Sequence, residues 1–307
     1  MTAHSKSLRG FAVFVAILVI TAAAGHSCGS PELEFDGQRA FGYLTDQVDL
    51  GPRNPGSPGA AKAIEYFRNF FDQLADTVVL QRFSFTDTLK DTMFNNLTNI
   101  VAKFHPEQLP RIMLCAHWDT RPFADHEPDS SLRNDPIPGA NDGASGCAVL
   151  MELANIIPKL DSRYGIDIVL FDIEDYGDAG HLDYFCIGSK HYVESIPANY
   201  YAFGILLDMI GDADLTIYRE SFSHRYARRV TDMVWDKAAE LGVTSFINAV
   251  KDTIYDDHVP FLQNGIPVCD LIDFDYPYWH THSDTPDKCS PQSLADVGKV
   301  LLALIRR

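Results

Sequence analysis

Acidic and histidine residues that could hold a metal ion occur at five sites far apart in the chain. These sites are His117 with Asp119, Asp142, Glu174 with Asp175, Asp208, and His280. Four of the five follow a short apolar run that is typical of a buried strand, and open α/β folds bind ligands at the carboxyl ends of their strands. Imidazole and carboxylate groups together suit zinc, which can leave one position open for substrate. The pattern therefore predicts a zinc enzyme.

Each of these residues also has a simpler explanation when it is taken alone. Asp142 lies in a glycine-rich stretch before an expected helix, where Asp is favoured as a cap. His280 follows Tyr278 and Trp279, and a histidine near aromatic rings is more often packed than ligating. The simple explanation is weaker for Glu174-Asp175, since the pair directly follows an apolar strand. The five sites together favour metal binding over separate structural roles.

The local sequence around two pairs of residues suggests what their side chains do. His117 and Asp119 are separated by one residue, so they share a face if the strand continues, and a carboxylate beside a ligating imidazole is a common arrangement. Asp256 and Asp257 precede an apolar stretch that reads as a helix, and negative charge at a helix N-terminus is favourable. That structural role can coexist with a functional one.

The apolar spacing predicts strands and helices in alternation, together with one long polar loop over residues 119–138. Strands are expected at 77–83, 97–104, 112–116, 166–171, 204–207 and 267–272. Helices are expected at 38–48, 58–74, 146–160, 188–195, 222–241 and 290–305, with 222–241 the longest. Alternation of this kind predicts an α/β fold: a single domain with a central mixed, mostly parallel sheet flanked by helices on both faces.

The bulk composition limits the partners that this protein can have. Of its 307 residues, 46% are hydrophobic, which is enough for one large core. Lys+Arg 25 against Asp+Glu 42 gives a net charge of -17, which disfavours binding to nucleic acid and anionic membranes. The same charge permits cationic ligands, including a free peptide amino terminus.

Residues 1–27 have the features of a secretory signal. Lys6 and Arg9 precede an apolar stretch over 11–25, which is shorter than the ~20 residues that span a bilayer. We therefore expect an exported protein, periplasmic or secreted, with no transmembrane domain after signal removal. A lipid anchor at Cys28 is the alternative to simple cleavage. We expect the catalytic domain to cover 30–307 and to be a monomer.

The six cysteines include no Cys-x-x-Cys pair, so a thiolate zinc site is not expected. Their spacing does not define a disulfide pairing. For Cys115 and Cys269, which lie in expected strands, we predict buried free thiols.

The motifs around these residues resemble those of the zinc aminopeptidase family. They are Gly51-Pro52-Arg53, Ala116-His117-Trp118-Asp119, Asn141-Asp142-Gly143, Glu174-Asp175, Leu207-Asp208-Met209 and Trp279-His280. Within that family the chain is most similar to the glutaminyl cyclase branch, in particular to bacterial cyclases of the animal type. The features that favour this branch are Asp256-Asp257-His258-Val259-Pro260-Phe261, Cys186-Ile187-Gly188-Ser189 and Trp279-His280. The resemblance covers essentially the whole chain after the signal.

The resemblance implies an enzyme that converts the N-terminal glutamine of peptides or proteins to pyroglutamate and releases ammonia. It implies one zinc ion, held by Asp142, Asp175 and His280. The other implied roles are a general acid/base at Glu174, an acid pair sharing a proton at Asp208 and Asp256, and a pocket wall at Trp279. Two positions depart from the animal enzymes: Asp175 replaces a glutamate, and Asp270 replaces a histidine that completes a proton network.

An aminopeptidase would use nearly the same residues in a different way. His117 and Asp208 would bind a second zinc ion, Asp142 would bridge the two metals, and Glu174 would activate a water molecule. All of these positions are present, so the number of ligands does not decide between the two enzymes. The orientation of Asp208, towards a metal or towards Asp256, is the expected discriminator. A binding domain without catalysis is disfavoured because Glu174 and the ligand positions are all present.

Overall fold

Six strands form a mixed sheet at the centre of this computed structural model, which describes residues 1–2, 33–178 and 180–307. The strand order is β1 (Thr77–Asp87), β2 (Thr92–Phe104), β4 (Gly165–Phe171), β3 (Arg111–His117), β5 (Phe203–Asp208) and β8 (Val268–Ile272). Pairings β1–β2 and β2–β4 are antiparallel, and the other three are parallel. The predicted mixed, mostly parallel sheet is therefore confirmed.

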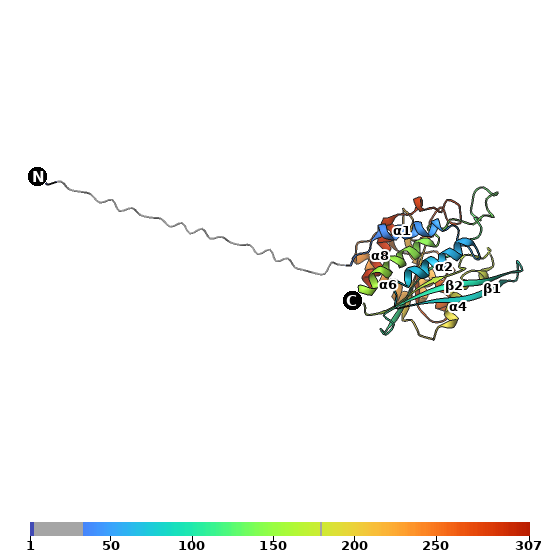
Figure 1. The fold of residues 1–307 in the computed structure, drawn as a ribbon, viewed down its shortest axis with the longest axis horizontal. Helices are drawn as coiled ribbons and strands as arrows, with labels where there is room; N and C mark the ends of the chain where they lie inside the picture. Colours follow the sequence, from blue (N-terminus) through green and yellow to red (C-terminus); the bar gives the residue numbers. More distant parts are fainter. Residues whose placement is uncertain (3–32, 179) are drawn as a thin grey trace. The chain divides into compact units, whose positions relative to one another are not determined.

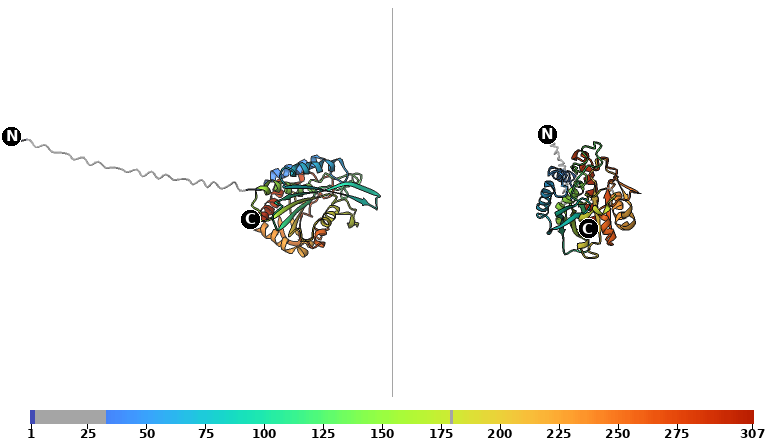
Figure 2. Two further views of the ribbon diagram at one scale, coloured as in Figure 1. Left: turned by 60° about the horizontal axis from the view of Figure 1, so that its bottom comes forward. Right: turned by 90° about the vertical axis from the view of Figure 1, so that its right-hand side faces the viewer.

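Helices cover both faces of this sheet (Figure 1). One face packs against α1 (Gly37–Asp49), α2 (Pro58–Phe71), α3 (Ala144–Ile156), α6 (Arg228–Glu240) and α8 (Pro291–Ile305). The other packs against α4 (Ile187–Ser195) and α7 (His258–Gln263). Figure 2 shows the N-terminal helices, in blue, on one side of the sheet.

Strand β3 shows why the central strands are apolar along their whole length. Ile112 and Leu114 belong to one hydrophobic core, whereas Met113 and Cys115 belong to the core on the opposite face. Successive side chains of a strand point to opposite faces, so a strand covered on both sides needs apolar residues at every position. The continuous apolar runs in the sequence are thus explained by this double cover.

The predicted helix over 222–241 is wrong as a single element. The chain forms α5 (Ser221–Tyr226) and α6, which are separated at Ala227, where φ is -118° and ψ is 30°. The longest helix in the described part of the chain is α8, with 15 residues. Apolar spacing is similar on both sides of Ala227, so a break at one residue leaves no mark on the periodicity.

A second, two-stranded parallel sheet was not expected from the sequence. It pairs β6 (Ile217–Glu220) with β7 (Phe246–Lys251). Strand β7 is mostly exposed or half-buried, and β6 has only four residues. Neither strand therefore carries the hydrophobic alternation that marks a half-buried strand.

The predicted loop over 119–138 contains no helix or strand, and a buried arginine holds both of its ends. Arg53 donates from Nε to the Trp118 carbonyl oxygen (3.0 Å) and from Nη2 to the Gly139 carbonyl oxygen (2.7 Å). A buried guanidinium must have its hydrogen bonds satisfied, and here carbonyl oxygens accept them. This contact gives the Gly51-Pro52-Arg53 motif its structural role.

The remaining predictions concern cysteines and the chain ends. Five cysteines lie in the described residues; all are buried free thiols, which confirms the prediction for Cys115 and Cys269. The predicted signal over 1–27 and the alternative anchor at Cys28 lie outside the described residues, apart from the first two positions. Leu33–Arg307 form one compact unit. Among the described residues, no helix combines the length and hydropathy needed to cross a membrane.

Candidate metal centre and active site

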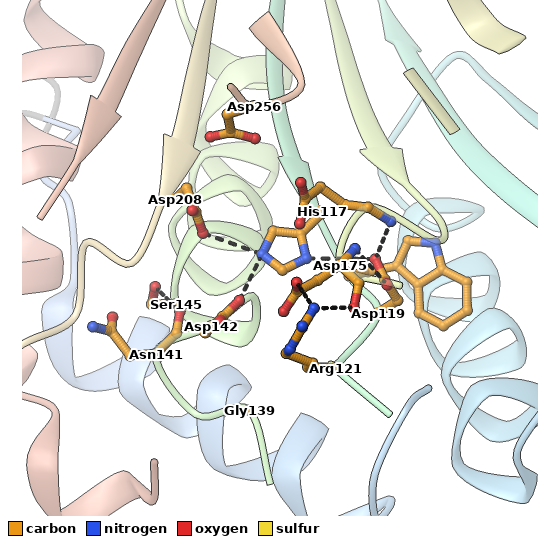
Figure 3. A network of polar contacts seen from close by, with 12 residues as sticks. His117, Asp119, Arg121, Gly139, Asn141, Asp142, Ser145, Asp175, Asp208 and Asp256 are labelled. Atoms are coloured by element: carbon orange, nitrogen blue, oxygen red, sulfur yellow. Dashed lines mark hydrogen bonds and ion pairs between the residues drawn. The ribbon is translucent and has the colours of Figure 1, made fainter. Parts of the chain in front are cut away.

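The predicted site residues gather at the carboxyl ends of the parallel strands and in the loops that follow (Figure 3). His117 ends β3, Asp208 ends β5, and Glu174-Asp175 follow β4 within four residues. The loops before α3 and α7 and after β8 supply Asp142, Asp256 and His280. Parallel strands present these ends at one edge of the sheet, which is where the sequence placed the chemistry.

Asp142, Asp175 and His280 form a compact cluster of ligand atoms. His280 Nε2 lies 3.1 Å from Asp175 Oδ2 and 3.7 Å from Asp142 Oδ2. Two ligands on a tetrahedral zinc ion at the usual bond lengths are about 3.3 Å apart. Both carboxylate oxygens are buried and have no hydrogen-bond partner. This donor set and spacing fit a single zinc ion.

A second cluster shares Asp142 with the first. His117 Nε2 lies 3.1 Å from Asp142 Oδ1 and 3.1 Å from Asp208 Oδ1. On the other side of the ring, His117 Nδ1 is 3.4 Å from Asp119 Oδ1, so the predicted pairing of His117 with Asp119 is present. Asp208 therefore faces His117, and Figure 3 shows Asp256 beyond it.

The simple explanation of Asp142 as a helix cap does not hold. Helix α3 has Gly143 as its N-cap, and no side chain caps it. A Cβ atom at Gly143 would lie 2.5 Å from the His117 ring, so this position must be glycine for the loop to approach the imidazole. Asp142 is therefore directed into the site by close packing of its loop.

Arg121 and Asp125, in the polar loop after β3, contact the first cluster on the side away from the candidate metal position. Asp125 Oδ1 lies 3.1 Å from His280 Nδ1, and Arg121 donates to Asp175 Oδ1 at 2.8 Å. Arg121 also donates to both oxygens of Asp125. Each ligand thus keeps one atom for a metal and has its other polar atom fixed. Both residues lie in the polar loop predicted over 119–138, but no motif in the sequence marks either of them.

Asp284 is a third residue that the sequence analysis did not single out. Its carboxylate accepts hydrogen bonds from the backbone N–H groups of Asn141 (2.8 Å) and Asp142 (3.2 Å) and from the Tyr276 hydroxyl (2.8 Å). Burial and the charge of Asp142 raise the pKa of Asp284 to about 7. Asp284 lies only four residues after His280. This closeness to a predicted ligand is the one sequence feature that could have marked Asp284 as part of the site.

Glu174 lies at the rim of the cluster and lines the adjoining pocket. Burial raises its pKa well above the ordinary value, and the charges of Asp175 and Asp256 add to this effect. Its backbone N–H donates to Asp119 at 3.0 Å, and its Oε1 accepts from the Cys186 thiol at 3.3 Å. A carboxyl group with a raised pKa beside a candidate metal can exchange protons near neutral pH.

A group of buried titratable residues continues behind Asp256. Burial and the charge of Asp208 raise the pKa of Asp256 well above its ordinary value. His258 Nδ1 lies 3.7 Å from Asp270 Oδ2, and His258 Nε2 lies 3.2 Å from Glu220 Oε2. Asp270, which stands where the animal enzymes have a histidine, therefore has an imidazole beside it from another element.

The cavity in front of these residues has a volume of about 320 Å³. Apolar side chains that include Ile254, Phe274 and Trp279 form part of its wall. The Trp279 ring is 3.8 Å from the His280 ring and 5.0 Å from the Phe274 ring, centroid to centroid. The packing expected for a histidine near aromatic rings is thus present, but His280 also keeps its Nε2 directed at the carboxylates.

Three residues at the site adopt a backbone conformation that is unfavourable for side chains other than glycine. Ile173 (φ 53°), Met209 (φ 46°) and His280 (φ 55°) each adjoin or belong to the clusters. Such conformations cost on the order of 1–3 kcal/mol each and persist only where the surrounding packing imposes them. These backbone conformations therefore lower the stability of the fold, but they orient the side chains of Glu174, Asp208 and His280.

Comparisons with known proteins show what this chain is similar to. The sequence profile of "Peptidase family M28" matches residues 99–305. The glutaminyl-peptide cyclotransferase of Bos taurus is 26% identical over 84% of this chain and 80% of its own. The crystal structure of Tannerella forsythia glutaminyl cyclase is 37% identical, with a TM-score of 0.84, covering 89% of this chain and 99% of its own. A Zn-dependent exopeptidase from Parabacteroides distasonis is 33% identical, with a TM-score of 0.85, covering 90% and 99%.

Replacing Asp125 should weaken metal binding without unfolding the protein. In Asp125→Asn, the carboxylate that holds His280 and Arg121 loses its charge, and loss of such a supporting group typically lowers metal affinity by about 10–100-fold. Competition with a zinc chelator measures this affinity. The matched control is Asp129→Asn in the same loop, where the exposed carboxylate only caps Ser131. Equal affinities in the two variants would contradict the positioning role.

Removal of zinc should cost more stability at high pH than at low pH. Burial alone would lower the pKa of His280, but Asp175 and Asp125 raise it from 6.5 to about 9 in the metal-free protein. The stabilisation from protonated His280, roughly 3 kcal/mol, is complete below pH 6.5 and is lost as the pH rises through about 9. Zinc-bound protein does not depend on this proton. Melting temperatures with and without chelator should therefore diverge between pH 6.5 and 9; a constant difference would refute the assignment.

Proposed function

This chain belongs to peptidase family M28, and on that premise we propose that it is a zinc-dependent glutaminyl-peptide cyclotransferase acting on peptide or protein N-termini. The observation that carries this proposal is the position of Glu174, which lies beside a three-ligand cluster and lines a small pocket with a partly aromatic wall. Similarity to glutaminyl cyclases over nearly the whole described chain supports the same conclusion.

In this proposal Asp142, Asp175 and His280 hold the metal. Zinc bound there would polarise the γ-carbonyl of an N-terminal glutamine and stabilise the charge that develops on its oxygen. Arg121 and Asp125 keep the ligands in place, because they fix the atoms of Asp175 and His280 that do not face the metal. Aspartate has a shorter side chain than glutamate, and the contact with the loop compensates for this by holding Asp175 in position.

Glu174 is the proposed proton carrier. The α-amine nitrogen of the substrate forms a bond to the γ-carbonyl carbon, and Glu174 accepts the proton that the amine loses. Glu174 then donates a proton to the side-chain amide nitrogen, the carbon–nitrogen bond breaks, and ammonia leaves. The raised pKa of Glu174 suits both halves of this exchange, since the group must accept and then return a proton.

Asp208 and Asp256 are proposed to share one proton beside the substrate. Burial and then the charge of Asp208 raise the pKa of Asp256, as expected where neighbouring carboxylates resist ionising together. Trp279 is proposed to wall the pocket for the glutamine side chain and to keep water from the reacting carbon. A pocket of about 320 Å³ can take one amino-acid side chain and the amine next to it.

The second candidate is a two-zinc aminopeptidase, and one observation favours it. His117, Asp142 and Asp208 offer three ligand atoms within 4.8 Å of one another, so a second metal position is complete. The orientation of Asp208 towards His117 fits this set. Glu174 would then activate a water molecule instead of the substrate amine. The two enzymes differ in the number of zinc ions and in the bond that breaks.

We also propose that the protein is exported, with a signal over 1–27, a catalytic domain from about residue 30 and a monomeric state. Export rests on the charged and apolar order of the first 25 residues. Lipid attachment at Cys28 would keep the protein at a membrane surface, whereas simple cleavage would release it.

Turnover of two peptides distinguishes the two candidate enzymes. We expect the purified protein to release ammonia from a Gln-peptide, to release no leucine from a Leu-peptide, and to contain one zinc ion per chain. Coupled ammonia detection, amino-acid analysis and metal analysis measure these quantities. Free leucine with two zinc ions per chain would establish the aminopeptidase instead.

Replacing Glu174 tests its role as proton carrier. Glu174→Gln should retain bound zinc, because Glu174 is not among the three ligands, and should lose roughly 10²–10⁴-fold in kcat. The matched control is Glu194→Gln on α4, an exposed glutamate outside the site, which should keep full activity. Near-normal turnover by Glu174→Gln with zinc still bound would overturn the assignment.

A further inference from the structure

A second cavity, of about 1150 Å³, opens at the edge of the sheet opposite the metal centre. Pro110 and Tyr164 stand directly before β3 and β4, and Phe203 begins β5; all three line this cavity. Strand β3 is seven residues long, so roughly 20 Å of strand separates the cavity from His117. The cavity is therefore distinct from the catalytic pocket.

The lining of this cavity is strongly basic, in contrast to the chain as a whole. Its arginines are Arg163, Arg225, Arg228, Arg229 and Arg307. Asp161 is the one acidic side chain among the described lining residues, whereas acidic residues outnumber basic ones 42 to 25 in the whole sequence. Charges beyond about 8 Å are largely screened at physiological ionic strength. The local potential is thus set by the arginines and not by the net charge of -17.

Most of this positive charge is not neutralised by the protein. Arg307 is 3.9 Å from Asp161, and Arg228 is 3.5 Å from Asp232. For the other three arginines, 163, 225 and 229, no carboxylate of the described chain lies within ion-pair distance. Like charges that gather without counter-charges repel one another and do not stabilise the fold. Their convergence on one cavity is better explained by a ligand.

The first turn of α6 adds to this positive potential. Arg228 and Arg229 begin the 13-residue helix, and no side chain caps its N-terminus. The free N–H groups at a helix N-terminus attract anions, and cations placed there are unfavourable for the helix itself. Two arginines at this position therefore oppose helix stability but complement an anion in the cavity.

Aromatic rings hold two of the unneutralised guanidinium groups. Arg163 lies over the Tyr164 ring at 4.9 Å, and Arg225 lies over the Tyr226 ring at 5.1 Å. Tyr226 is 57% exposed, so the guanidinium group that lies over its ring is also open to solvent and to a ligand. Stacking restricts the guanidinium planes and leaves their N–H groups available for an oxyanion.

We propose that this arginine pocket is a binding site for a phosphate-bearing anion. A phosphate group has up to about two negative charges and three acceptor oxygens, and guanidinium groups can bind it in a bidentate manner. The ligand can be free phosphate or the headgroup of an anionic phospholipid, since both present the same group. The site shares no residue with the proposed catalytic machinery.

Two probes, one triple variant of the pocket and one triple control variant test this proposal. Arg163→Gln/Arg225→Gln/Arg229→Gln removes the unneutralised guanidinium groups, and Arg68→Gln/Arg82→Gln/Arg133→Gln removes three exposed arginines from elsewhere as the charge-matched control. Calorimetry with inorganic phosphate measures the soluble source. Sedimentation with vesicles of phosphatidylcholine, alone or mixed with phosphatidylglycerol, measures the lipid source. Both use the zinc-loaded protein.

Native protein and the control variant should bind phosphate, phosphatidylglycerol vesicles, or both. The variant that lacks Arg163, Arg225 and Arg229 should bind the same probe at least about tenfold more weakly. Binding to only one probe identifies the source of the phosphate group. Absence of binding to both probes would overturn the proposal. Equal binding by the triple variant would also overturn it, because the anion would then lie elsewhere, for example on the zinc ion.

Discussion

Repulsion between the buried carboxylates of Asp142, in the loop before α3, and Asp175, which follows β4, is the constraint on which the site depends. Asp142 lies between His280 and His117, and the charge of Asp175 together with burial raises the pKa of Asp142. Burial alone would also raise the pKa of Asp175, but His280 and Arg121 bring it below the ordinary value. The pKa values of these two neighbouring carboxyl groups are thus shifted in opposite directions. A divalent cation between them would remove the conflict, and the buried oxygens without hydrogen-bond partners fit such a position.

The scaffold around this charge is rigid because it is packed on both faces. The apolar strands have two cores, and their ends cannot move apart without opening both. Arg53, Asp284 and Arg121 then join the loops around the site to one another through buried hydrogen bonds. That rigidity sustains the unfavourable backbone conformations of Met209 and His280. The site is precise because the surrounding structure leaves these residues no alternative.

One arrangement of side chains can support two related chemistries, as the similarity to both cyclases and a zinc exopeptidase indicates. Asp142 belongs to both ligand clusters, and Glu174 lines the pocket that the residues of the first cluster also line. We propose that the role of Asp208 separates the two reactions: it binds a second metal in the aminopeptidase and shares a proton with Asp256 in the cyclase. The fold is common to both.

The sequence by itself determined the six strands of the central sheet, most helices and the edge of that sheet where the candidate site lies. Helix caps at Ser57 and Ser290 and the apolar runs of β3 and β4 report local burial and hydrogen bonding, which neighbouring residues define. Only the tertiary structure decided that Asp125 and Asp284 contact candidate metal ligands, that the helix breaks at Ala227, and that arginines from separate segments line one cavity. Those contacts depend on how loops and helix ends meet across long sequence separations. No local pattern encodes such meetings, because periodicity records which face a residue presents and not which distant residue it reaches.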